Sequence, residues 1–137
     1  MPRLNYALLA SSVLEQNGLI SMLGAGIDRI GVPHLPAPPM VLTFVGGITY
    51  FDDELGHALP WDIELLGPNA AEPLIRVNGE VTPFRSEGAE LDLPISSRWV
   101  IPLPLQFHSA GVFHVAVRVG GQTIGDIPIL VVAESVQ

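Results

Sequence analysis

The strongest constraint on the fold is an alternation of apolar and polar side chains near the C-terminus. In a first run, residues 99–107, every second residue is apolar: Trp99, Ile101, Leu103, Leu105 and Phe107. A second run repeats the pattern with apolar Phe113, Val115, Val117 and Val119. A period of two residues is typical of β-strands that bury one face. Both runs are therefore predicted to be strands.

Two adjacent glycines, Gly120 and Gly121, separate the second run from an apolar third run, residues 122–132. This pair fits a two-residue hairpin turn, because the favoured turns need positive φ angles that glycine adopts without strain. We expect three antiparallel strands with one apolar face. Such a sheet cannot stand alone in water, so the rest of the chain must cover it.

The N-terminal third predicts two more strands, residues 4–13 and 19–30, on either side of a turn-rich tetrapeptide. We interpret the first as a strand rather than a cleaved signal peptide, because its apolar stretch is short and Asn5 interrupts it. Glycines inside the second, at positions 24 and 26, indicate a bulge or a close approach by another backbone. The proline-rich residues 32–39 are expected to cross from one sheet to another.

The middle of the chain continues the pattern. Residues 40–51 and 59–65 look like strands, and Asn78-Gly79 is expected to form a hairpin turn. Pro102 and Pro104 are two residues apart, so their missing N–H groups face the same lateral side, which suits a sheet edge or a bulged segment.

Short strands separated by turns, with no helical period, predict an all-β fold. The specific prediction is an immunoglobulin-like antiparallel β-sandwich of about seven to nine strands. The length favours a single domain over residues 1–137.

Composition limits the partners. The net charge is −8, and all six basic residues are arginines, which disfavours nucleic acid and anionic membranes. No apolar run approaches the roughly 18 residues that span a bilayer. Charged residues make up 15% and apolar residues 48% of the chain, so apolar surface should remain exposed for a protein partner or a homo-oligomer. The absence of cysteine fits a reducing cytoplasm and excludes disulfides.

The densest acidic cluster is Asp52, Asp53 and Glu54, with His57 close behind. Loop carboxylates are the ligands that calcium prefers, and loops at the end of a sandwich often supply them. The regular spacing of a calcium loop is absent, and neighbours on an extended chain point in opposite directions. These four residues are a weak candidate ligand-binding site beside the alternative of a solvated turn.

Other constellations do not support an enzyme. His108 and His114 bracket a turn and could contribute to a metal or acid–base site, but nothing in the sequence brings a third ligand to them. Gly24-Ala25-Gly26 lacks the third glycine and the helix of a dinucleotide fingerprint, since position 29 is arginine. We expect no cofactor, no metal and no catalytic residues.

Both ends of the chain resemble a known family. Leu8-Leu9-Ala10-Ser11, Leu23-Gly24-Ala25-Gly26 and Gly111-Val112-Phe113 are similar to motifs of small bacterial proteins assigned to a domain of unknown function. Serine stands where that family tends to have aspartate, and phenylalanine where it has tyrosine. The resemblance implies a β-sandwich and transfers no functional residue.

The leading hypothesis is a non-enzymatic, cytoplasmic β-sandwich that acts by protein–protein contact, through self-association or structural assembly. The alternative is a small-ligand or carbohydrate-binding module that uses the loops at residues 52–58 and 85–97, with or without calcium. A metal-assisted hydrolase that uses the histidines is a more distant possibility.

Overall fold

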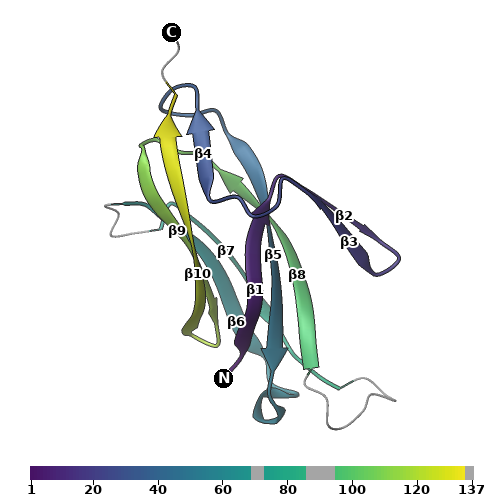
Figure 1. The fold of residues 1–137 in the computed structure, drawn as a ribbon. Helices are drawn as coiled ribbons and strands as arrows, with labels where there is room; N and C mark the ends of the chain where they lie inside the picture. The colour runs from purple at the N-terminus through teal and green to yellow at the C-terminus, as the bar shows by residue number, and fades with distance from the viewer. Residues whose placement is uncertain (69–72, 86–94, 135–137) are drawn as a thin grey trace.

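The computed structural model describes residues 1–68, 73–85 and 95–134, and within them the chain forms ten strands (Figure 1). One sheet has three antiparallel strands in the order β1, β5, β8. Their bounds are Arg3–Ala10, Met40–Tyr50 and Ile95–Leu105.

A second sheet has five strands in the order β4, β10, β9, β6, β7. Their bounds are Arg29–Val32, Gln122–Ala133, Gly111–Val119, Leu59–Leu66 and Ile75–Val81. The sheet curls like half of a barrel. Its neighbours are antiparallel except for β4 and β10, which run parallel. The remaining strands, β2 (Ser12–Gln16) and β3 (Leu19–Leu23), form a separate two-stranded hairpin.

The all-β prediction is confirmed. Two details differ from the sequence interpretation. Ten strands replace the expected seven to nine, because the N-terminal third is divided into four strands instead of two. The parallel pairing of β4 with β10 departs from a purely antiparallel arrangement.

The core lies between the two sheets, and the predicted alternation supplies it. On β8 and just after it, Trp99, Leu103, Leu105 and Phe107 are buried. On β9 the buried side chains are Phe113, Val115, Val117 and Val119. The rings of Phe107 and Phe113 meet edge to face, with centroids 5.0 Å apart. Edge-to-face packing suits the charge distribution of aromatic rings, so this pair joins the two sheets favourably.

The expectation that β8, β9 and β10 form one sheet is wrong. β8 pairs only with β5, while β9 and β10 belong to the five-stranded sheet. Pro102 and Pro104 lack N–H groups on one side of β8, and β5 occupies its other side. β8 is therefore a sheet edge, as the prolines predicted, and the chain crosses between sheets before β9 begins.

The turn predicted at Asn78-Gly79 is also wrong. Both residues lie inside the continuous strand β7, where Gly79 pairs with Trp61 of β6. A Cβ atom at position 79 would lie 2.6 Å from Cζ2 of the Trp61 ring. This glycine makes room for a tryptophan instead of supplying a turn, and the neighbouring strand decides the local conformation.

Two other sequence interpretations are confirmed. Gly120 and Gly121, with φ angles of 63° and 82°, form the turn between β9 and β10. Residues 33–39 lead from β4 in one sheet to β5 in the other, as expected of the proline-rich segment.

Candidate interaction surfaces

The hairpin of β2 and β3 projects away from both sheets, and we call residues 12–23 the arm (Figure 1). Five residue pairs join its strands, from Ser12 opposite Leu23 to Gln16 opposite Leu19. Asn17 and Gly18 form its turn, with φ angles of 52° and 76°. Positive φ at both central residues matches the right-handed twist of a hairpin, and asparagine followed by glycine adopts it most readily.

One face of the arm carries leucines exposed to solvent. Leu14 faces Ser21, and Leu19 and Leu23 occupy the two diagonal positions on the same side. Their exposed fractions are 61%, 72% and 72%. Diagonal neighbours lie within reach of long side chains. We call Leu14, Leu19 and Leu23 the leucine face; the residues directly opposite them on the same side are polar, namely Ser21, Gln16 and Ser12.

The base and the tip of the arm are fixed to the body. At the base, the Ser11 backbone N–H and hydroxyl both donate to the carbonyl oxygen of Leu23, at 3.1 and 2.8 Å. Gly24, with a φ of 60°, passes so close that a Cβ would lie 2.4 Å from the Ser11 hydroxyl oxygen. At the tip, the Arg98 guanidinium donates to the carbonyl oxygen of Gly18 at 3.1 Å. The arm is thus held in one direction relative to β8.

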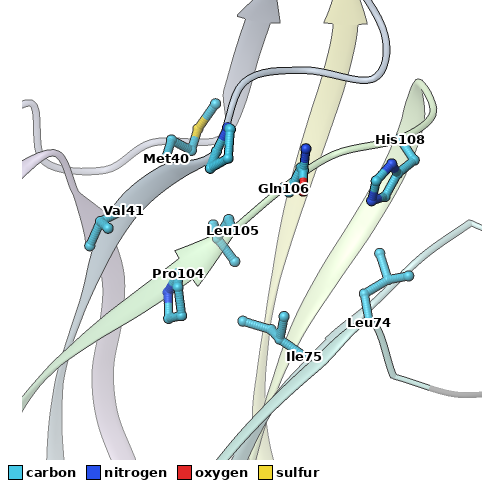
Figure 2. A pocket seen from close by; sticks show the side chains of 9 residues that line it. Met40, Val41, Leu74, Ile75, Pro104, Leu105, Gln106 and His108 are labelled. Atoms are coloured by element: carbon cyan, nitrogen blue, oxygen red, sulfur yellow. The ribbon is translucent and has the colours of Figure 1, made fainter.

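An apolar pocket of about 510 Å³ opens where β5 begins, β8 ends and β7 begins (Figure 2). We call it the end pocket, and nine residues line it: Pro39, Met40, Val41, Leu74, Ile75, Pro104, Leu105, Gln106 and His108. None carries a formal charge at neutral pH with histidine neutral. Figure 2 shows Gln106 and His108 together at one side of the apolar wall. The volume falls within the range of ligand pockets.

The acidic candidates lie at a short 3-10 turn, η1 (Asp52–Glu54), that follows β5. Glu54 is buried, and its Oε1 accepts the backbone N–H of Phe51 at 2.8 Å. Its Oε2 lies 3.5 Å from the amino group of Met1. Glu54 therefore stabilises the turn that contains it.

The other acidic candidates are more exposed. Asp52 pairs with Arg85 at 3.1 Å, while Asp53 and His57 lie on the surface. Within the described ranges, no three side chains of the metal-binding types come together. Ligand binding by Asp52, Asp53, Glu54 and His57 stays a prediction. Most of the second loop proposed for a ligand, residues 86–94, lies outside the described residues.

The two histidines singled out in the sequence have different surroundings. His108 lines the end pocket, whereas the Nδ1 of His114 lies 2.9 Å from a carboxylate oxygen of Asp126 on the neighbouring strand. In the part of the chain that the structure describes, neither histidine belongs to a group of three potential metal ligands. They therefore belong to separate environments.

An ion-pair network covers the outer face of β9, β6 and β7. Arg118 donates to Asp62 at 2.9 Å and also to Glu64, and Arg76 contacts both carboxylates, at 3.2 and 3.4 Å. The hydrogen bond to Asp62 raises the pKa of Arg118 above its ordinary value. Partial desolvation opposes this rise, and the charges of Asp62 and Glu64 reinforce it. The network links the three neighbouring strands β9, β6 and β7, and we interpret its role as stabilising the sheet.

The sequence of the chain matches a known protein family. The model of a family of unknown function, DUF6941, matches residues 5–132. The chain belongs to the DUF6941 family. No curated protein and no solved structure matches it. The resemblance to an uncharacterised domain family is thereby confirmed. The family description assigns no function to the DUF6941 chain.

Among the described residues, no helix has the length and apolar character needed to cross a membrane.

Sequence reasoning missed the arm and the end pocket. It assigned residues 19–30 to one strand, whereas β3 ends at Leu23 and a separate strand, β4, begins at Arg29. The turn-rich tetrapeptide at residues 15–18 did indicate a turn between two strands, but a turn signal cannot show whether the hairpin packs on the body. The end pocket is built from three strand ends far apart in the DUF6941 sequence, so no local pattern could have indicated it.

Proposed function

We propose that this DUF6941 chain is a non-enzymatic protein that acts by protein–protein contact, through self-association, and that the arm carries the contact. The observation that supports this most is the leucine face, three leucines exposed by 61–72% on one side of a projecting hairpin. Exposed apolar patches mark interaction sites more often than isolated exposed side chains do.

The stability of a hairpin gives a second reason. A two-stranded sheet is marginally stable in water without a third layer to pack against. The arm pairs with neither main sheet, and its contacts with the body include those at Ser11, Gly24 and Arg98. Packing of a partner against the leucine face would supply the missing layer.

The energy of burial sets the expected strength of association. Full burial of a leucine is worth roughly 1.5–3 kcal/mol. About two-thirds of each leucine is exposed, so covering the leucine face would contribute about 3–6 kcal/mol. Association itself costs an estimated 4–15 kcal/mol, so these leucines alone cannot hold a permanent complex. Self-association is therefore expected to depend on concentration and to use further contacts.

The scaffold that we infer for this role is an immunoglobulin-like sandwich. The order of strands supports it, because β1, β5 and β8 correspond to strands A, B and E of that fold. In the other sheet, β6, β9 and β10 correspond to C, F and G, and β7 adds a strand beside C. The additional parallel strand β4 extends the sheet next to strand G.

The test is light scattering in line with size-exclusion chromatography over a range of concentrations. We expect a defined oligomer for the unmodified chain and a monomer for the Leu14→Ser, Leu19→Ser, Leu23→Ser triple variant. Phe84→Ser is the matched control, because Phe84 is exposed by 72% but lies outside the arm.

Self-association through the arm is refuted by either of two results. The first is an unmodified chain that stays monomeric at the highest concentration. The second is a triple variant that associates as the unmodified chain does, with a circular dichroism spectrum showing that it is folded.

A further inference from the structure

We infer that the arm of one copy seats in the end pocket of a second copy, so that the contact joins two different surfaces of the chain. This rests on the proposed self-association and names the surface that receives the arm. The leucine face presents aliphatic side chains on a projecting element, and the end pocket offers an apolar hollow of about 510 Å³. Each copy carries both halves of the contact.

Charge favours this pairing. Two copies with a net charge of −8 each repel over most of their surfaces. The arm contains one formally charged residue, Glu15, and the end pocket contains none. In addition, Glu15 lies on the opposite side of the arm from the leucine face, so it can remain in solvent. Contact between arm and end pocket therefore brings little like charge together.

The polar side chains of the end pocket suit an extended hairpin. Gln106 donates one hydrogen bond to the carbonyl oxygen of Ala37 at 3.2 Å, which holds it beside the apolar wall. His108 is exposed at the same side of the end pocket. A hairpin that pairs with neither main sheet has backbone groups along its outer edges, and these are partners for such side chains.

The extent of the two surfaces fits a reversible complex. A standard interface uses roughly 20–30 residues on each side. The arm has twelve residues and the end pocket nine, so a single contact falls short of that size. A copy that donates its arm and also receives one engages residues of both sets and comes near the lower limit. Reciprocal exchange in a closed dimer provides this, because both contacts then belong to one interface.

Disulfide trapping tests the inference, since the chain contains no cysteine. One copy carries Leu19→Cys in the arm, and the other carries Val41→Cys or Leu74→Cys in the end pocket. Val41 and Leu74 are exposed by 58% and 44%, so both replacements should be tolerated. The matched control is Val112→Cys, exposed by 46% and outside the end pocket. The copies are mixed, oxidised gently and separated by mass.

We expect the mixed cross-link between arm and end pocket to exceed the cross-link to position 112 by about tenfold, because binding raises the local concentration of the two thiols. A dominant Leu19→Cys homodimer would show that arms pair with each other. That result overturns the inference and leaves self-association through the arm intact.

A second outcome is equally decisive. In this outcome, light scattering shows an oligomer that depends on the leucine face, while neither end-pocket cysteine cross-links above the control. The arm would then contact another surface, and the inference fails alone. An unmodified chain that is monomeric throughout removes the proposed function and this inference together, which the light-scattering measurement shows independently of trapping.

Discussion

The direction of the arm depends on Arg98, and replacing this residue by methionine should loosen the arm without affecting the core. Arg98 donates from β8 to the carbonyl oxygen of Gly18 at the tip. Methionine keeps an unbranched apolar stem but cannot donate this hydrogen bond. The rest of the arm is five residue pairs with no third strand, so few other contacts compensate.

The magnitude follows from the setting of this hydrogen bond. Hydrogen bonds to charged groups contribute about 1.5–3 kcal/mol, but Arg98 is exposed, so we take about 1 kcal/mol. A loss of that size changes an opening equilibrium roughly fivefold. Amide hydrogens of residues 12–23 should therefore exchange about fivefold faster in Arg98→Met, and those of β9 and β10 should not change.

Hydrogen exchange followed by mass spectrometry measures this effect, at a concentration where light scattering shows a monomer. Arg3→Met is the control, since it removes the same charge from an exposed position on β1. A looser arm must also be ordered on binding, so we expect self-association to weaken by a similar factor. Unchanged exchange in the arm of Arg98→Met would show that the tip is held by other contacts, and the reasoning would be refuted.

Two stability predictions follow from the five-stranded sheet. Gly79→Ala places a Cβ 2.6 Å from the Trp61 ring, so we expect a loss of about 1–3 kcal/mol and a Tm lower by roughly 4 °C per kcal/mol; an unchanged Tm would mean that the ring moves freely. Arg118→Met removes a partner of two largely buried carboxylates and should cost about 1–2 kcal/mol, between the values for exposed and buried ion pairs. In a denaturant double-mutant cycle with Asp62→Asn, the two losses should be less than additive, and strict additivity would contradict direct coupling.

Much of the strand content could be predicted from the sequence, because a strand that buries one face has alternating apolar and polar residues. The alternation from Trp99 to Val119 indicates both β8 and β9, although β8 begins earlier, at Ile95, inside the predicted loop at residues 85–97. Gly120-Gly121 marks the turn that follows β9. The assignment of strands to sheets could not be predicted in the same way. It depends on which edges can donate hydrogen bonds and on contacts between distant segments, such as Phe107 against Phe113.

Glycine shows why local signals are ambiguous. Asn17-Gly18 and Asn78-Gly79 are identical dipeptides, yet the first forms a hairpin turn and the second lies within a strand. The difference arises because β6 offers a pairing partner and the ring of Trp61 to the second dipeptide. The same dipeptide in the arm has no third strand beside it, so its intrinsic preference for a turn prevails.

Composition predicted that apolar surface would be exposed, but it could not locate that surface. A chain with 48% apolar and 15% charged residues could place its surplus in a larger core, in scattered positions or in one surface. The strand register of the arm decides among these three locations for part of the surplus, because it puts Leu14, Leu19 and Leu23 on the same side of a projecting hairpin. A strand register shifted by one residue would have placed leucines on both sides of the arm. The position of the proposed interaction surface therefore depends on strand pairing, so composition could predict exposed apolar surface and only the structure shows where it lies.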